Sequence, residues 1–341
     1  MKRFLIVKPS SLGDVVHAFP AVSLLAETVP DAEIDWLVIP SLAPLVKYHP
    51  AVKDVILFQR KEMGRITEFP KAFLNLWSSI RKKRYDAVID LQGLLRSSLI
   101  SRLAKSSSFA GPAECRESVS TVFYTQKLHS SENSSHAVWK NLAMMADFLK
   151  VPVPEKPKFE FKRDPDAAGR TDRLLRGIAH EKYIAAAPGA RWESKQWPPD
   201  FFAECINLFL ERHRDYYAVL LGSGNEKGQG EELKKHLRFP VLDLIGATGL
   251  PELVECLRNA SLLFCNDSGP MHIAAAVNTP LTAFFGPTDP GLTGPFAERA
   301  SVLKPDLDCI NCFRKVCETM KCHAALTPEQ AVSAAESLLT K

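Results

Sequence analysis

The segment Lys8-Pro-Ser-Ser-Leu-Gly-Asp14-Val-Val-His17 places a carboxylate where a ligand could bind. It follows the apolar run Phe4–Val7, so we expect a strand, then a loop of small residues, then a helix with Asp14 in its first turn. In an open α/β sheet, ligands bind at the carboxyl ends of the strands. Asp14 therefore lies in the right place for chemistry, although a carboxylate that merely caps the helix explains this stretch equally well.

The segment Leu262–Ala276 has the features of an anion-binding site. An apolar strand is expected to lead into the corner Asp267-Ser-Gly269, after which Pro270 begins a helix. The N–H groups and the positive dipole end of a helix start bind phosphate, and Gly269 lets a ligand approach the backbone. His272, in the first turn, can reach the same anion. A well-capped core helix with His272 turned to its flank is the alternative.

Two further segments follow strand-like runs and carry polar groups suited to a nucleotide. In Ala187-Pro-Gly-Ala-Arg-Trp-Glu-Ser-Lys195, a glycine turn precedes two cations, and Lys195 is a point charge that can offset the charge of a departing diphosphate. In Leu221-Gly-Ser-Gly-Asn-Glu226, the glycines permit close approach and Glu226 could bind the diol of a ribose. A solvated loop lysine and an ordinary Gly-x-Gly turn are the alternatives. A full Gly-x-Gly-x-x-Gly follows the first strand of neither half, which argues against a nicotinamide or flavin oxidoreductase.

The elements expected to position these residues alternate between strand-like and helix-like patterns in both halves of the chain. In the first half, strands are expected at 4–7, 34–39, 54–58 and 87–91, and helices at 15–26, 66–84, 97–104 and 138–149. In the second half, strands are expected at 183–187, 218–221, 241–245, 262–265 and 281–285, and helices at 201–213, 226–237, 250–259, 271–277 and from Thr327 onward. Pro20 is expected to kink the first helix or to divide it in two.

This alternation predicts an α/β protein with parallel sheets covered on both faces. Four prolines between Val151 and Pro165 predict an extended connector, and thus two domains. Two α/β domains joined in this way leave a cleft between them, which is the usual place for a substrate. The uneven, serine-rich stretch Glu114–Ser135 is expected to be a loop or lid facing that cleft.

Composition narrows the class of protein. The 341 residues suit two domains, and 46% hydrophobic with 24% charged residues is typical of a soluble globular protein. No run approaches the roughly 20 apolar residues that span a bilayer, and the basic N-terminus has too short an apolar core for a signal peptide. The net charge of +4 is too mild for a dedicated nucleic-acid binder, so we expect no nucleic-acid partner.

The chain contains eight cysteines, four of which lie close together near the C-terminus. The spacing Cys309-x2-Cys312-x4-Cys317-x4-Cys322 could give tetrahedral thiolate ligation of a structural zinc or iron ion. Four reduced cysteines packed in a loop are the alternative, because the spacing departs from common zinc-finger forms.

Taken in order, the four segments around Asp14, Lys195, Glu226 and Asp267 resemble those of the ADP-heptose:lipopolysaccharide heptosyltransferases, glycosyltransferase family 9. The resemblance covers nearly the whole chain. It implies the GT-B fold, with two facing Rossmann-like domains, parallel sheets and an interdomain cleft. Residues 1–160 would bind the acceptor, 161–325 would bind the nucleotide-sugar, and the C-terminal helix in 326–341 would pack back toward the N-terminal domain.

The resemblance also implies roles for single residues. Asp14 corresponds to the catalytic carboxylate and Lys195 to the lysine at the diphosphate. The residues expected to bind the donor are Gly189, Ala190, Lys195, Gly222, Glu226, Ile245, Gly246, Asp267, Ser268, Gly269 and His272. Those expected to bind the acceptor, including basic residues that follow strands of the first half, are Lys8, Ser10, Ser11, Gly13, Arg60, Lys61 and Arg96.

The implied reaction is inverting transfer of heptose from ADP-L-glycero-D-manno-heptose to a hydroxyl of the lipopolysaccharide inner core, either on Kdo-lipid A or on a core heptose. Asp14 would act as general base, and catalysis would need no cofactor. A transferase of the same fold with a protein or another surface polysaccharide as acceptor is one alternative, and a non-catalytic nucleotide-sugar-binding protein is another. We expect a cytoplasmic protein, and peripheral contact with the inner membrane is one role that Arg81-Lys-Lys-Arg84 could have. Simple solvation and helix-dipole contacts also explain that cluster.

Overall fold

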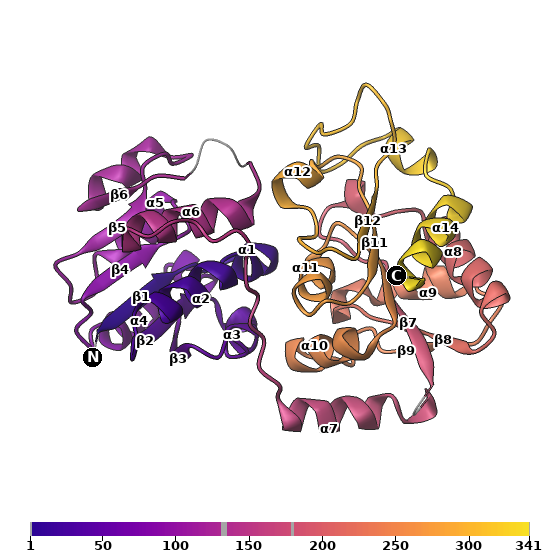
Figure 1. The fold of residues 1–341 in the computed structure, drawn as a ribbon, viewed down its shortest axis with the longest axis horizontal. Coiled ribbons are helices and arrows are strands. Elements are labelled where there is room, and N and C mark those ends of the chain that lie inside the picture. Colours follow the sequence, from indigo (N-terminus) through magenta and orange to yellow (C-terminus); the bar gives the residue numbers. More distant parts are fainter. Residues whose placement is uncertain (1, 131–134, 179–180, 341) are drawn as a thin grey trace. The chain divides into compact units, whose positions relative to one another are not determined.

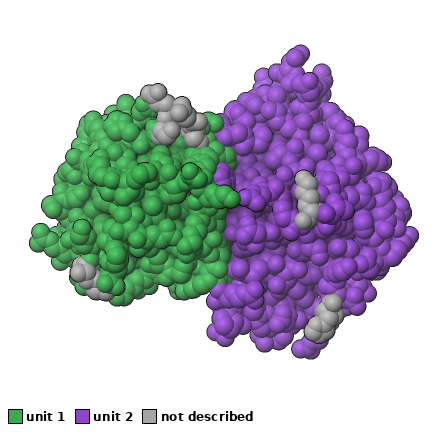
Figure 2. All heavy atoms as spheres, in the orientation of Figure 1, with its two compact units in different colours: residues 1–162 green, residues 163–341 purple. Residues whose placement is uncertain are grey.

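The computed structural model describes residues 2–130, 135–178 and 181–340, and the chain folds into two compact units (Figure 1). Unit 1 comprises Met1–Lys162 and unit 2 comprises Arg163–Lys341 (Figure 2). Each unit contains a six-stranded sheet whose neighbouring described strands are all parallel. The predicted α/β fold with two parallel sheets is therefore confirmed. The division of the chain lies two residues beyond the expected boundary at residue 160.

The sheet of unit 1 has the order β3-β2-β1-β4-β5-β6. Its strands are β1 (Arg3–Val7), β2 (Glu33–Val38), β3 (Val52–Leu57), β4 (Ala87–Asp90), β5 (Phe109–Pro112) and β6 (Gln126–Leu128). Its helices are α1 (Leu12–His17), α2 (Phe19–Thr28), α3 (Ala43–Val46), α4 (Phe69–Ile80), α5 (Leu95–Ser101) and α6 (Ala137–Leu149), with 3-10 turns η1 (Pro40–Leu42), η2 (Glu62–Gly64) and η3 (Ser118–Phe123).

The apolar run of β1 forms the centre of this sheet because both of its faces are covered. Phe4–Val7 are buried, and Val7 pairs with Leu37 of β2 on one side and with Asp90 of β4 on the other. This register brings the residues that follow β1 and β4 to the same edge of the sheet. It therefore fixes where the loop that carries Asp14 begins.

Prolines set the boundaries of two helices in unit 1. The helical pattern after β1 is divided at Ala18 into α1 and α2, with Pro20 in the first turn of α2, as predicted. The helix predicted over 66–84 is shorter in the structure, because Pro70 lies in the first turn of α4 and the residues before it include η2. Proline is favoured in a first turn, where its missing N–H has no helical partner to lose.

The sheet of unit 2 has the order β12-β11-β10-β7-β8-β9. Its strands are β7 (Lys182–Ala187), β8 (Tyr216–Leu220), β9 (Leu242–Asp243), β10 (Leu262–Asn266), β11 (Leu281–Phe284) and β12 (Ala300–Leu303). Its helices are α7 (Pro165–Leu174), α8 (Pro199–Arg212), α9 (Lys227–Lys234), α10 (Leu250–Asn259), α11 (Gly269–Ala276), α12 (Pro290–Thr293), α13 (Lys321–Ala324) and α14 (Pro328–Leu339), with 3-10 turns η4 (Arg176–Ile178), η5 (Glu193–Lys195) and η6 (Gly224–Glu226). Among the helices described in the two units, none is long and apolar enough to cross a bilayer.

The last helix, α14, begins at the predicted capping box. The Thr327 hydroxyl accepts a hydrogen bond from the N–H of Gln330, whose side-chain oxygen accepts one from the N–H of Thr327. One face of α14 enters the core of unit 2, where it contacts α8, β11 and β12. The expected packing of residues 326–341 toward the first domain stays a prediction.

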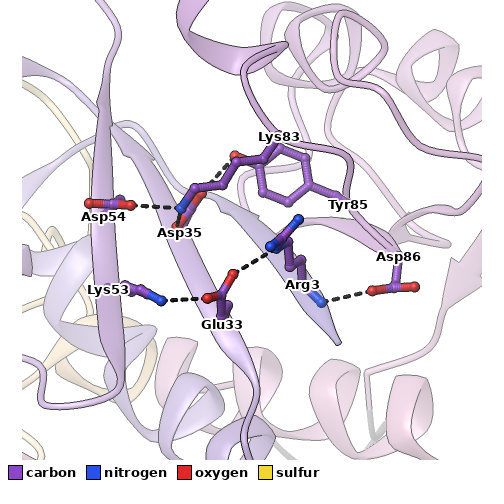
Figure 3. Close-up of polar contacts among 8 residues, drawn as sticks. All are labelled: Arg3, Glu33, Asp35, Lys53, Asp54, Lys83, Tyr85 and Asp86. Carbon is purple, nitrogen blue, oxygen red and sulfur yellow. Dashed lines mark hydrogen bonds and ion pairs between the residues drawn. The ribbon is translucent and has the colours of Figure 1, made fainter. Parts of the chain in front are cut away.

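Charged residues near the amino ends of the unit 1 strands form a paired network (Figure 3). Asp35, which is almost fully buried, accepts hydrogen bonds from Lys83 Nζ at 2.9 Å and from the Tyr85 hydroxyl at 2.7 Å. Lys83 Nζ also lies 2.6 Å from Asp54 Oδ2, and Glu33 pairs with both Arg3 and Lys53. Lys83, one of the four cations of the Arg81–Arg84 cluster, is therefore held by two carboxylates of the same unit and is not freely solvated.

His49, which follows α3, is fully buried in unit 1. Its Nδ1 accepts a hydrogen bond from the N–H of Ala51 at 3.2 Å, so the ring hydrogen is on Nε2, which faces Ser23 Oγ at 3.1 Å and the carbonyl of Phe19 at 3.2 Å. Burial lowers the pKa of His49 to about 4. The neutral ring is thus part of the folded structure, and its protonation at Nδ1 would break the bond to Ala51.

This arrangement predicts an acid-sensitive stability of unit 1. An unfolded histidine takes up its proton near pH 6.5 and the folded one only near pH 4, so the free energy of unfolding should fall by about 2 kcal/mol on going from pH 7.5 to pH 5. Urea unfolding of the full chain at several pH values measures this loss. The His49→Gln variant, which keeps a donor and an acceptor but does not titrate, is the control. Parallel pH profiles for the two proteins would contradict the prediction.

Candidate active site

Asp14 lies in the first turn of α1, as predicted, and is half-buried. Its Oδ2 accepts hydrogen bonds from the backbone N–H of Ser11 at 2.8 Å and from Ser11 Oγ at 2.7 Å. Within the described residues, Oδ1 receives no hydrogen bond. One carboxylate oxygen therefore caps the helix while the other keeps its lone pairs for a ligand, so a capping role does not exclude a chemical one.

Lys8 directly follows β1, at the start of the loop that leads to Asp14. It is only 7% exposed, and its Nζ donates a hydrogen bond to the carbonyl of Leu91 after β4. Burial lowers the pKa of Lys8, while the nearby carboxylates of Asp14 and Asp90 oppose that shift. Asp90 is fully buried, which raises its pKa, and it accepts a hydrogen bond from the Tyr124 hydroxyl at 2.8 Å. The bond from Lys8 to Leu91 joins the ends of β1 and β4 at the start of the loop that carries Asp14.

A cavity of about 200 Å³ opens beside this loop, at residues that follow β1, β3 and β4. Two arginines, one carboxylate, neutral polar groups and apolar side chains line it: Pro9, Ser10, Phe58, Arg60, Gln92, Leu94, Arg96, Ser97, Ile100 and Glu117. Among the described residues, Arg60 and Arg96 form no ion pair. The lining suits a polar, anionic ligand.

Three of the predicted acceptor residues, Ser10, Arg60 and Arg96, come together in this cavity. The other four do not line it: Lys8 is buried below, Ser11 and Gly13 belong to the turn and first turn of α1, and Lys61 is exposed before η2.

Glu117 lines the cavity but is not among the residues predicted to bind the acceptor. It lies in the serine-rich stretch 114–135, which we expected to form a loop or lid. Its carboxylate accepts a hydrogen bond from the N–H of Leu95 at 2.7 Å, at the start of α5. The stretch also contains η3 and β6, so it is not a simple loop, because Gln126–Leu128 pair with β5. Residues 131–134 of the stretch lie outside the described residues.

In unit 2, the predicted donor-binding residues lie beyond the carboxyl ends of four neighbouring strands, β10, β7, β8 and β9. The side chain of Glu226 lies against Gly189, which follows β7, and Gly222, which follows β8. A Cβ atom at Gly189 would come within 2.0 Å of Glu226 Oε1, and one at Gly222 would lie 3.1 Å from Oε2. Only glycine at 189 admits the carboxylate there. Oε2 also accepts a hydrogen bond from the N–H of Ser223, so Oε1 is the oxygen left toward a ligand.

Lys195 and Asp267 meet at this edge of the sheet although they are 72 residues apart in sequence. Lys195 Nζ lies 2.6 Å from Asp267 Oδ2, and the Thr288 hydroxyl donates to the same oxygen at 2.6 Å. Asp267 is 5% exposed and Lys195 is 17% exposed. Lys195 Nζ also lies 4.7 Å from the centre of the Trp192 ring. Thr288, which follows β11, is a site residue that the sequence analysis missed.

The corner after β10 opens directly into α11. Ser268 is the N-cap residue in extended conformation and Pro270 lies in the first turn, so the first N–H groups of the helix have no helical acceptor. Ser268 Oγ is buried and forms no hydrogen bond within the described residues. His272 is buried in the first turn. A helix N-terminus with an unpaired hydroxyl beside it favours an anion.

The turn after β9 closes against the turn after β8. Gly246 has a φ of +76°, which favours glycine, and its N–H donates to the carbonyl of Gly222 at 2.9 Å. Ile245 is buried against Gly222 and Gly230. Ala190, on the β7 side, accepts a hydrogen bond from Gln196 through its carbonyl. This region offers an apolar side chain and backbone groups, which suit a nucleobase.

The four C-terminal cysteines do not form the predicted metal site in the structure. Cys309 and Cys312 are exposed, whereas Cys317 and Cys322 are half-buried. Across residues 2–130, 135–178 and 181–340, no group of three or more His, Cys, Asp or Glu is placed to hold a metal ion. A structural zinc or iron at Cys309, Cys312, Cys317 and Cys322 is therefore not supported.

Relatives of known name are similar to the chain over its whole length. Lipopolysaccharide heptosyltransferase 1 of Pseudomonas aeruginosa is 29% identical over 99% of this chain and 98% of its own length. Among solved structures, Escherichia coli heptosyltransferase WaaC with ADP has a TM-score of 0.80 at 24% identity, covering 98% of this chain and 99% of its own. A glycosyltransferase family 9 protein from Veillonella parvula has a TM-score of 0.84 at 21% identity, covering 99% of this chain and 97% of its own. Both likenesses show that the fold is shared.

The family comparison covers both units. The model of glycosyltransferase family 9 (heptosyltransferase) matches residues 73–323, which is more than half of the chain and includes the Lys195, Glu226 and Asp267 segments. The fold, the polar groups at the carboxyl ends of both sheets and this match agree. The chain belongs to glycosyltransferase family 9, the heptosyltransferases.

Proposed function

We propose that this enzyme transfers heptose from ADP-heptose to a hydroxyl of the lipopolysaccharide inner core, with inversion at the anomeric carbon. The observation that carries the proposal is the Lys195–Asp267 pair directly before the N-terminus of α11, in a chain whose family transfers heptose. The names of the relatives give the sugar and the acceptor class. Solved neighbours of the same fold were obtained with ADP and with an ADP-2-deoxy-2-fluoro heptose.

The donor would bind to unit 2 through its nucleotide. Ile245 and Gly246 would contact the adenine, Glu226 Oε1 would accept from a ribose hydroxyl, and the diphosphate would lie at Lys195 and the first N–H groups of α11. Asp267 holds Lys195 in place through the ion pair, and Ser268 Oγ has hydrogen-bonding capacity left for a phosphate oxygen. Positive charge at this point stabilises the ADP that departs.

The acceptor would bind to unit 1 in the cavity beside Asp14. Arg60 and Arg96 suit the carboxylates and phosphates of an inner core. Asp14 Oδ1 would remove the proton from the attacking hydroxyl of the acceptor. The oxygen of that hydroxyl forms the bond to the anomeric carbon as the bond between this carbon and ADP breaks. The products are the extended core, ADP and a proton on Asp14, which then passes to solvent.

The Asp14→Asn variant tests this mechanism. The amide oxygen can still accept from Ser11, so the cap is kept, but the side chain can no longer take a proton. We expect kcat to fall by about 10²- to 10⁴-fold, the range of a general base, while ADP affinity changes less than about twofold. The measurement is release of ADP from ADP-heptose in the presence of a Kdo-containing acceptor, with binding of ADP by calorimetry as control. Turnover within threefold of the unmodified enzyme would remove Asp14 from the mechanism.

We further propose a cytoplasmic enzyme that touches the inner membrane through the segment 60–84, called the basic segment below. It contains eight Lys or Arg and two Glu residues, whereas the whole chain has a net charge of only +4. Within it, α4 carries an aromatic stripe: Phe69 and Phe73 have ring centres 5.8 Å apart, and Phe73 and Trp77 are 6.1 Å apart. Helices with aromatic and basic side chains of this kind lie in the headgroup region of anionic bilayers.

The aromatic stripe of α4 is accessible to solvent, and an arginine lies next to its last ring. Leu74 is 62% exposed, Phe69 44% and Trp77 39%, and the Arg81 guanidinium lies 4.4 Å above the centre of the Trp77 ring. The segment starts at Arg60, which lines the proposed acceptor cavity. Contact of this face with a bilayer would therefore bring the cavity to a lipid-linked acceptor.

Neutralising three exposed cations of the basic segment should weaken membrane binding. The triple variant Lys71→Gln, Lys82→Gln, Arg84→Gln keeps Lys83, which is paired with Asp35 and Asp54. At about 1 kcal/mol per cation, we expect affinity for vesicles containing phosphatidylglycerol to fall at least about tenfold in a sedimentation assay. The control removes three exposed lysines elsewhere in unit 1: Lys127→Gln, Lys140→Gln, Lys156→Gln. Equal binding by both triple variants would refute the proposed surface.

A further inference from the structure

The segment that carries the C-terminal cysteines packs against the turn that carries Lys195. Ser194, which is 1% exposed, donates a hydrogen bond from its N–H to the carbonyl of Lys315 at 3.2 Å and one from its hydroxyl to the carbonyl of Arg314 at 2.6 Å. The Nε2 of His323 lies 2.6 Å from the carbonyl of Ser194. The indole N–H of Trp197 donates to the carbonyl of His323 at 3.1 Å. Four hydrogen bonds therefore hold the residues on both sides of Lys195.

His323 is fully buried at the centre of this contact. A carbonyl can only accept a hydrogen bond, so the ring hydrogen is on Nε2 and points at Ser194. Burial lowers the pKa of His323, which keeps the ring neutral. A neutral buried histidine with one defined tautomer donates in a single direction, as a rigid support requires.

The same segment contacts the turn after β11 on its other side. The N–H of Phe313 donates to the carbonyl of Pro287 at 2.8 Å. A Cβ atom at Gly286 would lie 2.8 Å from Cys322 Sγ and 2.9 Å from His323 Nε2, so only glycine leaves room for this packing. Thr288, two residues on, bonds to Asp267. The segment thus packs against both turns whose side chains, Lys195 and Thr288, converge on Asp267.

From these contacts we propose that His323 is a positioning residue for Lys195: its Nε2–H fixes the carbonyl of Ser194 and so sets the place of the Lys195 ammonium at the donor diphosphate. The inference rests on the proposed role of Lys195 in binding that diphosphate. It assigns to residues 313–323 the task of supporting the donor site. Loss of the Nε2 donor would let the turn move, and the Lys195 ammonium would then lie less favourably for its electrostatic contact with the diphosphate.

Two substitutions of His323 separate donation from volume. In His323→Gln, the side-chain amide nitrogen stands as many bonds from Cβ as Nε2 does and can donate to Ser194. In His323→Met, a methyl group occupies that place and cannot donate. Because His323→Met no longer fixes the turn that carries Lys195, we expect ADP to bind about tenfold more weakly to it, and within about twofold of the unmodified enzyme to His323→Gln. ADP affinity is measured by calorimetry, and thermal unfolding verifies that both variants fold.

A double-mutant cycle with Lys195→Met tests whether the effect passes through Lys195. Coupling is expected: in the Lys195→Met background, the further change His323→Met should leave ADP affinity unaltered. Additive losses would overturn the positioning role of His323 while leaving the proposed role of Lys195 intact. An ADP affinity unaffected by Lys195→Met alone would instead contradict the proposed diphosphate role itself. If His323→Met fails to fold, Ser194→Ala, which removes only the bond to Arg314, tests in the same cycle the support that residues 313–323 give to this turn. A loss of about threefold that disappears in the Lys195→Met background is expected, and an additive loss would overturn that support.

Discussion

The organisation of the proposed donor site depends on the burial of one carboxylate, Asp267. A charge that is almost excluded from water needs compensating partners, and Lys195 and Thr288 supply them from two separate turns. Because both partners bind the same oxygen, the turns after β7, β10 and β11 are joined at one point. Lys195 is thereby held directly before the N-terminus of α11, and Ser194 in the same turn is hydrogen-bonded to Arg314 and His323.

The two edges of the unit 1 sheet use charge in different ways. At the amino ends of the strands, Asp35, Glu33 and their cations are mutually paired, which is the arrangement expected of a structural network (Figure 3). At the carboxyl ends, buried Lys8 lies close to Asp90, while Asp14 keeps one oxygen without a hydrogen bond among the described residues. The carboxyl edge is the candidate site because α/β sheets bind ligands there and because one Asp14 oxygen can still accept a hydrogen bond from a ligand.

Sequence patterns were sufficient for the elements that carry the site. The apolar runs of β1, β7 and β10 are buried on both faces, so they are visible without knowledge of their partners. The strands β5 and β12 escaped prediction, since β5 (Phe109–Pro112) is short and contains glycine and proline. The connector predicted up to Pro165 overlaps the start of α7, where Asp164 caps the helix and Pro165 occupies its first position.

Contacts between distant residues could not be predicted in this way. Nothing in the local sequence shows that Lys195 meets Asp267, that Thr288 joins them, or that Glu117 reaches the cavity beside Ser10. The cysteine spacing allowed a metal site that the described residues do not support, and it did not show that residues 313–315 bond to Ser194 and Pro287. Pairing across a fold depends on strand order and register, which a single sequence does not encode locally.

The most direct test of the central claim is the stereochemistry of the product. The purified enzyme would be incubated with ADP-heptose and a panel of truncated lipopolysaccharide acceptors, and the product examined by mass spectrometry and NMR. We expect an acceptor heavier by one heptose residue, linked with the anomeric configuration opposite to that of the donor. Retention of the donor configuration, or release of ADP without a heptose-bearing product from any acceptor, would contradict it.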